Sequence, residues 1–314
     1  MTSRFYYFYL ALFISLAFLI IFFTLSAFGV IQSVENSYLI GEASRWCEKV
    51  SGGLFREPVN TLTNLGFMIV GLFIFWTLCN DPKDNTNPFI GLNSISILYA
   101  SVVIYLGPGS MLMHGTNTEW GGWADNLSMI MFIILPWLYN LFTMTNWSTK
   151  KFLFIYTAIV IIYSIWRWFT DFELGINFNL FGVSIGLWVI SETLYKFWSP
   201  AFRFISGFVG FIVLMIFGTM PQEVFNNLNE FWWIILFWLP GLIANKKPVH
   251  SRSYKWFFLG MFSYLAAFAI WLTGVPDNTL CNPDSLIQAH GIWHLLTAIS
   301  TYFFFLHYRN LKQV

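Results

Sequence analysis

Long apolar stretches with almost no charge constrain this chain more than any other feature. The first covers residues 5–31, and further runs follow along the 314 residues. Apolar runs of about 18 to 25 residues are long enough to cross a bilayer as helices. Only 10% of the residues are charged, whereas a soluble domain carries about 25%. The sequence therefore predicts an all-α, polytopic membrane protein.

Ten runs qualify as candidate transmembrane helices. They cover about residues 5–31, 59–79, 89–113, 123–145, 152–168, 177–197, 201–219, 230–245, 254–274 and 286–307. The runs at 201–219 and 230–245 are the weakest, because glycines interrupt one and the other is short. We expect a single transmembrane domain over residues 1–314, with about ten spans.

The first run predicts an N-terminal signal-anchor helix over residues 5–31. The run is too long for the apolar core of a signal peptide, and no clear small-x-small cleavage site follows it. Cleavage of this segment is the alternative interpretation.

The basic residues predict how the helices are oriented, because Lys and Arg gather on the cytoplasmic side of membrane proteins. If the N-terminus is cytoplasmic and all ten runs cross, only four of the 16 Lys and Arg residues face the other side. These four are Arg45, Lys49, Arg56 and Arg167. The same topology places both termini in the cytoplasm. It places Cys47 and Cys281 together on the opposite side, where a disulfide persists.

Five polar residues lie inside or at the ends of apolar runs, near the predicted non-cytoplasmic face. Ser110 and His114 are four residues apart, and so are His290 and His294. Residues at this spacing share one face of a helix. Asp125 lies at the start of the apolar run that follows His114. Ionisable groups in membrane helices are costly and commonly functional, so these residues predict a site.

Three histidines on two helices are typical of a zinc site with three protein ligands and one open position. We expect His114, His290 and His294 to bind Zn²⁺, which activates a water and polarises a carbonyl. Asp125 would transfer the proton, and Ser110 would donate a hydrogen bond to the oxyanion or act as nucleophile. Taken singly, each residue has a structural alternative: a helix–helix hydrogen bond for a histidine, packing for Ser110 and helix capping for Asp125.

These residues and their surroundings resemble the alkaline ceramidase family. The motifs near the site are Ser110-x-x-x-His114, Asp125 and His290-x-x-x-His294, the last within HGIWHLLTA. The N-terminal motifs are Trp46-Cys47-Glu48 and Glu57-x-x-Asn60-Thr61-x-Thr63-Asn64. The resemblance covers about residues 45–130 and 280–305, and the segment between matches only in being hydrophobic. The family belongs to a superfamily of membrane hydrolases that includes adiponectin-type receptors and GPI-remodelling proteins.

The resemblance implies a seven-helix core within about residues 45–310, to which this chain adds extra helices. It implies a zinc ion held by the three histidines, catalytic roles for Ser110 and Asp125, and a disulfide between Cys47 and Cys281. It also implies hydrolysis of the amide bond of ceramide to a sphingoid base and a fatty acid. Such a lipid substrate would enter from the bilayer.

Some members of the family bind calcium through the N-terminal motif, and Trp46, Glu48 and Glu57 match that site. Arg45 and Val50 stand where an acidic and an amide ligand are expected. Calcium prefers about six to eight oxygen ligands, which a cation in the shell opposes. Two alternatives follow: a Ca²⁺ site, or a metal-free network in which Arg45 pairs with Glu48 or Glu57.

Other functions stay open at the level of the sequence. The same site fits hydrolysis of another lipid amide or ester, and a receptor-like relative would keep zinc without turnover. A transporter is a third class, although it predicts polar or broken helices near the membrane midplane. The net charge of +1 and the lack of basic clusters give no indication of nucleic-acid binding.

Overall fold

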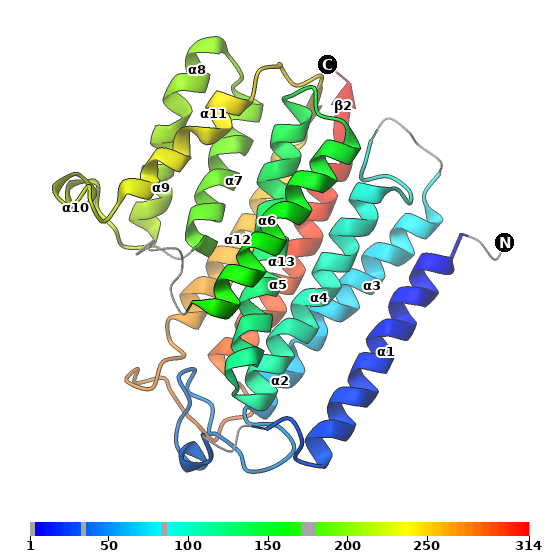
Figure 1. Cartoon of the computed structure of the whole chain (residues 1–314), viewed down its shortest axis with the longest axis vertical. Helices are drawn as coiled ribbons and strands as arrows, with labels where there is room; N and C mark the ends of the chain where they lie inside the picture. The colour runs from blue at the N-terminus through cyan, green and yellow to red at the C-terminus, as the bar shows by residue number, and fades with distance from the viewer. Residues whose placement is uncertain (1–3, 33–35, 83–86, 171–179, 314) are drawn as a thin grey trace. The chain divides into compact units, whose positions relative to one another are not determined.

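The structure is mostly helical and contains almost no strand (Figure 1). It is a computed structural model that describes residues 4–32, 36–82, 87–170 and 180–313. Five helical segments in these ranges are long and apolar enough to cross a membrane: Tyr6–Ala27, Pro58–Asn80, Ser94–Thr116, Glu119–Thr143 and Thr149–Phe169. The expected all-α, membrane-type fold is confirmed. Helix length does not decide the count of ten spans, which stays a prediction.

The chain divides into two compact units. Unit 1 is built from residues up to Ser128 and from Arg252 to Leu311, and unit 2 from Met129 to Ser251 and the end of the chain. Unit 1 contains α1 (Tyr6–Ala27), η1 (Ser37–Leu39), α2 (Pro58–Thr63), α3 (Leu65–Asn80), α4 (Ser94–Thr116), the start of α5 (Glu119–Thr143), α12 (Tyr254–Trp271) and α13 (Ala289–Arg309). The expectation of one transmembrane domain stays a prediction.

The rest of α5 belongs to unit 2, with eight further helical elements among its described residues. These are α6 (Thr149–Phe169), α7 (Leu180–Lys196), α8 (Pro200–Ile205), η2 (Ser206–Phe208), α9 (Val209–Ile216), α10 (Pro221–Asn226), η3 (Trp232–Trp238) and α11 (Leu239–Ile243). Two short strands, β1 (His250–Arg252) and β2 (Leu311–Gln313), pair into a sheet.

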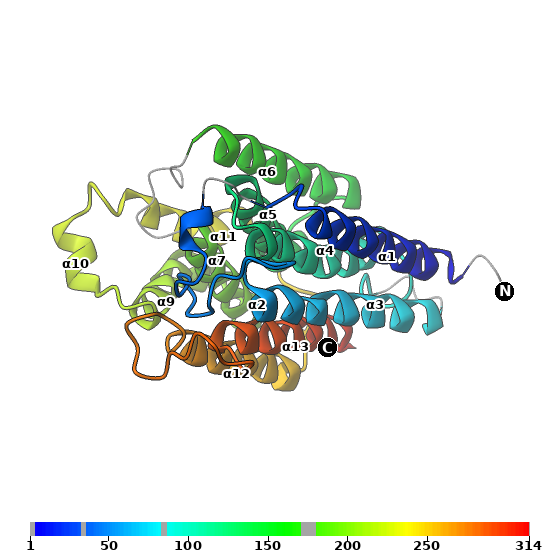
Figure 2. The ribbon, with the colours of Figure 1, turned by 90° about the horizontal axis from the view of Figure 1, so that it is seen from below.

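In unit 1, α3 lies between α4 and α13, and α12 runs along α13 (Figure 2). The helix expected at residues 5–31 forms α1, which packs against α3 and α4. Phe22 of α1 stacks on Phe55 at a ring-centroid distance of 5.2 Å, in a buried cluster with Met68 and Met111. Contacts between side chains therefore hold α1 against the unit.

The two weakest predicted runs form short helical pieces in unit 2. The run at 201–219 corresponds to α8, η2 and α9, and the run at 230–245 to η3 and α11. A Cβ at Gly207 would lie 2.5 Å from the Trp238 ring, and one at Gly210 would lie 2.2 Å from the Phe237 ring. The glycines that weaken the first run as a span thus let the second run pack against it. The run at 177–197 is α7 from Leu180 onward, and residues 177–179 lie outside the described residues.

An ion pair joins three chain segments at one end of unit 1. The Asp81 carboxylate, just after α3, accepts two hydrogen bonds from the Arg309 guanidinium at the end of α13, at 2.6 and 2.7 Å. It also accepts from the Gly91 N–H at 2.9 Å, and Arg309 donates to the Phe89 carbonyl at 3.0 Å. Burial raises the pKa of Asp81, but the Arg309 and Gly91 hydrogen bonds outweigh it, so the pKa lies below its usual value.

We expect Asp81→Asn and Arg309→Met each to lower the free energy of unfolding by about 3 kcal/mol, because the first leaves the half-buried Arg309 and the second the buried Asp81 without its partner. The double variant should lose little more, and additive losses in a thermal unfolding assay would contradict the pairing. Because the folded-state pKa of Asp81 is depressed, its stabilisation is present above its unfolded pKa of about 3.9 and is lost as the pH falls. The difference in stability between wild type and Asp81→Asn should therefore narrow in acid.

Candidate active site

Helix α4 carries Ser110 and His114 one turn apart. The helix begins with a capping box, in which the Asn93 side chain accepts from the Ser96 N–H and the Ser96 hydroxyl accepts from the Asn93 N–H. It continues through Pro108 and ends at Thr116. The stretch from Gly107 to Ser110 is therefore helical, and Ser110 and His114 lie on one face of α4.

Three buried imidazoles meet in unit 1. His114 of α4 and His290 and His294 of α13 are 1%, 6% and 3% exposed. Their candidate ligand atoms all lie within 4.8 Å of one another, and the Nε2 atoms of His114 and His290 are 3.1 Å apart. Two nitrogens bound tetrahedrally to one zinc at about 2.05 Å would be about 3.3 Å apart. The observed spacing fits a shared metal ion.

The second ring nitrogen of His114 is held by a carboxylate. Nδ1 lies 2.7 Å from Oε2 of Glu57, which is itself buried and also accepts from the Asn60 side chain at 2.9 Å. An ionised carboxylate accepts hydrogen bonds only, so Nδ1 of His114 carries the proton and Nε2 is left as a ligand. Such an outer carboxylate is the usual support of a metal-binding histidine.

His294 is held by a hydroxyl. Its Nδ1 lies 3.0 Å from the Thr63 hydroxyl, which lies 2.9 Å from the Val59 carbonyl oxygen. The single hydroxyl hydrogen points to that carbonyl, so Nδ1–H of His294 is the donor to Thr63 and Nε2 is unprotonated. The close approach of α13 to α2 is possible because Gly291 faces Thr63, where an added Cβ would lie 3.1 Å from the Thr63 methyl group.

Ser110 and Asp125 form a polar pair beside the histidines. The Ser110 side chain lies beside the Asp125 carboxylate, and its Oγ lies 3.5 Å from Nε2 of His294. Helix α5 begins at Glu119, so Asp125 lies in its second turn and is not a capping residue. The neighbouring Gly109 lets α5 approach α4, because an added Cβ would lie 2.5 Å from Ser128.

The geometry thus brings together the five residues singled out by the sequence: Ser110, His114, Asp125, His290 and His294. The ceramidase family model matches residues 43–313, which include all five. The chain belongs to the ceramidase family. The resemblance expected from the motifs is therefore confirmed, while α1 precedes the matched region. A search of curated proteins gave no match.

In this ceramidase-family protein, the third N-terminal motif residue, Glu48, caps a helix. Its carboxylate accepts from the N–H groups of Val59 and Asn60 at 2.6 and 2.8 Å, in the first turn of α2. These N–H groups have no partner within the helix, and Pro58 has none to offer. Burial raises the pKa of Glu48, against the lowering effect of the two N–H bonds.

The residues at the expected calcium position do not fit Ca²⁺. Both Glu48 oxygens already accept backbone hydrogen bonds, and Glu57 is bonded to Asn60 and His114. Val50 adds an apolar side chain, so the donor set falls short of the about six to eight oxygens that calcium takes.

The expected metal-free network is present, but the part assigned to Arg45 is wrong. Arg45 does not pair with Glu48 or Glu57 in the part of the chain that the structure describes. Its guanidinium carbon instead lies 4.8 Å from the centroid of the Trp46 ring. The Glu48 carboxylate accepts from backbone N–H groups, and the Glu57 carboxylate is bonded to the Asn60 and His114 side chains. The network therefore does not depend on Arg45.

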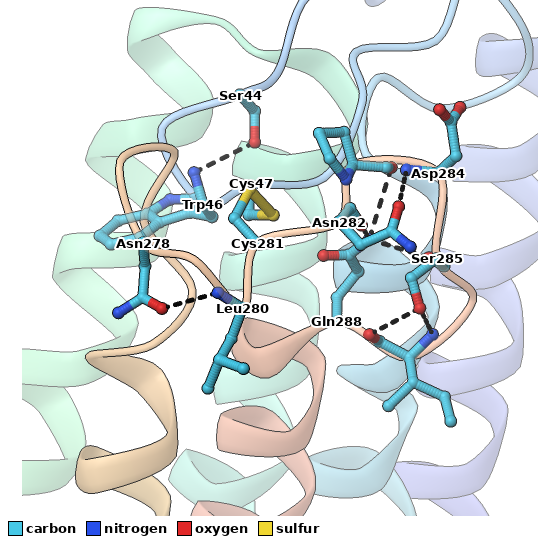
Figure 3. Close-up of a disulfide and its surroundings, with 12 residues drawn as sticks. Ser44, Trp46, Cys47, Asn278, Leu280, Cys281, Asn282, Asp284, Ser285 and Gln288 are labelled. Carbon is cyan, nitrogen blue, oxygen red and sulfur yellow. Dashed lines mark hydrogen bonds between the residues drawn. A yellow bond between two sulfur atoms is a disulfide. The ribbon is translucent and has the colours of Figure 1, made fainter.

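Cys47 and Cys281 form the expected disulfide (Figure 3). The bond joins the loop before α2 to the loop before α13 across 234 residues of sequence. Lys49 adds two contacts between the same loops, an N–H bond to the Pro283 carbonyl and an ion pair with Asp284, both 3.0 Å. These contacts tie together two loops. One precedes α2, whose residues support the histidines, and the other precedes α13, which carries His290 and His294.

Sequence reasoning missed two roles in this site. Glu57 was expected only in a calcium site or bracing network, yet it directly supports His114. Thr63 belongs to the N-terminal motif, which by itself predicts no role for it, yet its hydroxyl supports His294. Spacing along one helix could not reveal either contact, because each joins different helices.

We expect Cys47→Ser and Cys281→Ser each to lower stability by about 2 to 5 kcal/mol, because each removes the same long crosslink. The double variant should lose little beyond either single one. Thermal unfolding measures this, and reductant should destabilise wild type but leave the double variant unchanged. Additive losses would contradict a shared role for the two cysteines.

Proposed function

We propose that this ceramidase-family protein is a zinc-dependent amidohydrolase of ceramide or a related long-chain lipid amide. It releases a sphingoid base and a free fatty acid. The observation that carries the proposal is the convergence of three buried imidazoles beside a Ser110–Asp125 pair. A zinc ion with a structural role alone requires no such hydroxyl–carboxylate pair.

His114, His290 and His294 would hold the zinc through Nε2. Glu57 and Thr63 favour this by keeping the proton of two of the rings on Nδ1. Zinc, when bound at three histidines, lowers the pKa of a water and polarises a carbonyl group.

Asp125 handles the proton. Its carboxylate accepts a proton from the attacking water and delivers it to the amide nitrogen, which leaves as the amine of the sphingoid base. The Ser110 hydroxyl, which lies beside Asp125, turns its single hydrogen to the substrate oxygen and donates a hydrogen bond to it as charge develops there. Ser110 is buried and Asp125 is half-buried, so little water competes for these bonds.

The lipid enters from the bilayer, with its amide near the membrane surface and its chains among apolar helices. We infer one transmembrane domain of about ten spans, both termini in the cytoplasm and the site near the non-cytoplasmic face. The bias of the basic residues supports this orientation. So does the Cys47–Cys281 disulfide, because disulfides persist in oxidising compartments.

Metal analysis tests the zinc site. Wild type should carry about one zinc per chain, and the His290→Ala, His294→Ala double variant should carry none and be inactive. A chelator selective for calcium should leave ceramide hydrolysis unchanged, because Glu48 and Glu57 are satisfied by the protein. A strong zinc chelator should abolish hydrolysis. Full hydrolysis by a metal-free protein would contradict the proposal.

Asp125→Asn tests the proton transfer. This variant should keep its zinc but lose turnover by about 10²- to 10⁴-fold, because the amide cannot accept the proton. Ser110→Ala should lower turnover by about 10²- to 10³-fold at unchanged zinc content. Lys150→Gln, which changes an exposed residue at the start of α6, is the matched control. Zinc binding without hydrolysis of any lipid amide or ester by wild type would favour a receptor-like protein instead.

A further inference from the structure

The three histidines are supported unequally. His114 and His294 each use Nδ1 in a hydrogen bond, to Glu57 and Thr63. Nδ1 of His290 is buried and has no hydrogen-bond partner among the described residues. A metal-binding histidine normally has its ring orientation fixed by a bond from the other nitrogen. Another contact must therefore fix the orientation of His290.

Trp46 supplies a planar contact to His290. The two rings stack with centroids 4.5 Å apart and an angle of 15° between their planes. Rotation of the imidazole about its bond to Cβ would break this face-to-face contact. The stack therefore restricts the same motion that a hydrogen bond at Nδ1 would restrict.

Trp46 is itself held in place. The Trp271 ring lies 5.2 Å from it, and the Arg45 guanidinium lies over it at 4.8 Å, an arrangement favoured by cation–π attraction. The backbone N–H of Trp46 donates to the Ser44 hydroxyl at 3.1 Å (Figure 3). Next to it, Cys47 has a φ of +73°, an uncommon conformation for a residue other than glycine, and is fixed to Cys281 by the disulfide.

We propose that Trp46 is a positioning residue for His290, taking the place of an outer hydrogen bond at this ligand. This inference rests on the proposed function, since it concerns the ring that would hold zinc. Trp46 contacts the ligand and neither substrate nor reacting atoms. It keeps Nε2 of His290 directed at Nε2 of His114, 3.1 Å away.

The test uses the full-length protein with Co²⁺ in place of zinc, because the visible absorption of Co²⁺ reports the geometry of its ligands. Trp46→Leu removes the planar face, whereas Trp46→Phe keeps one. We expect Trp46→Leu to release metal to excess chelator about tenfold faster or more, with an altered Co²⁺ spectrum. Trp46→Phe should restore both towards wild type. Trp76→Leu, at a 46% exposed position of α3 that packs on Phe5 and Phe8, is the matched control and should release metal as wild type does.

The outcomes separate this inference from the proposed function. Wild-type protein that binds no metal would overturn both. Wild type that binds metal, with Trp46→Leu unchanged in release rate and spectrum, would overturn the role of Trp46 alone. If Trp46→Leu does not fold, Trp46→Met provides the same comparison with an unbranched side chain. Equal release rates for Trp46→Phe and Trp46→Met would then overturn the inference.

Discussion

The contact between Glu57 and His114 is the interaction on which the rest of unit 1 depends. The carboxylate fixes the imidazole at 2.7 Å, and the backbone N–H of the same glutamate donates to the His114 carbonyl at 2.9 Å. The neighbouring Arg56 N–H donates to the Gly115 carbonyl. The loop before α2 thus donates hydrogen bonds to two carbonyl groups at the C-terminal end of α4, and it orients a candidate metal ligand. Glu48 from the same loop caps α2, so two helix termini and one imidazole share a single support.

This sharing follows from the cost of polar groups in apolar surroundings. A buried carboxylate or unpaired N–H loses its hydration, and only a partner from the protein compensates for that loss. Helix caps, histidine supports and the Ser110–Asp125 pair therefore belong to one connected region. The disulfide closes the region by joining its two loops. The polar contacts that stabilise unit 1 are thus the contacts that shape its candidate active site.

Much of the candidate site's geometry could be predicted because its spacing is local. Ser110 and His114, like His290 and His294, are one helical turn apart, and helix geometry alone places each pair on one face. The family match then agrees with the motifs from which the resemblance was drawn. The supports of the histidines were not predictable in this way. Thr63 and His294 are separated by 231 residues, and the choice of partner depends on how α2 packs against α13.

The sequence by itself determined the helical, membrane-type fold and the family, and it singled out the five residues that the structure brings together in the candidate site. Apolar run length and the four-residue spacing act within one segment, where backbone geometry is regular. Only the tertiary structure decided that Glu48 caps α2, that Arg45 lies over Trp46, and that Trp46 stacks on His290. Each of these residues is chemically suited to several partners. Which partner it meets depends on the close approach of segments far apart in the chain, and that approach is set by packing and by the disulfide.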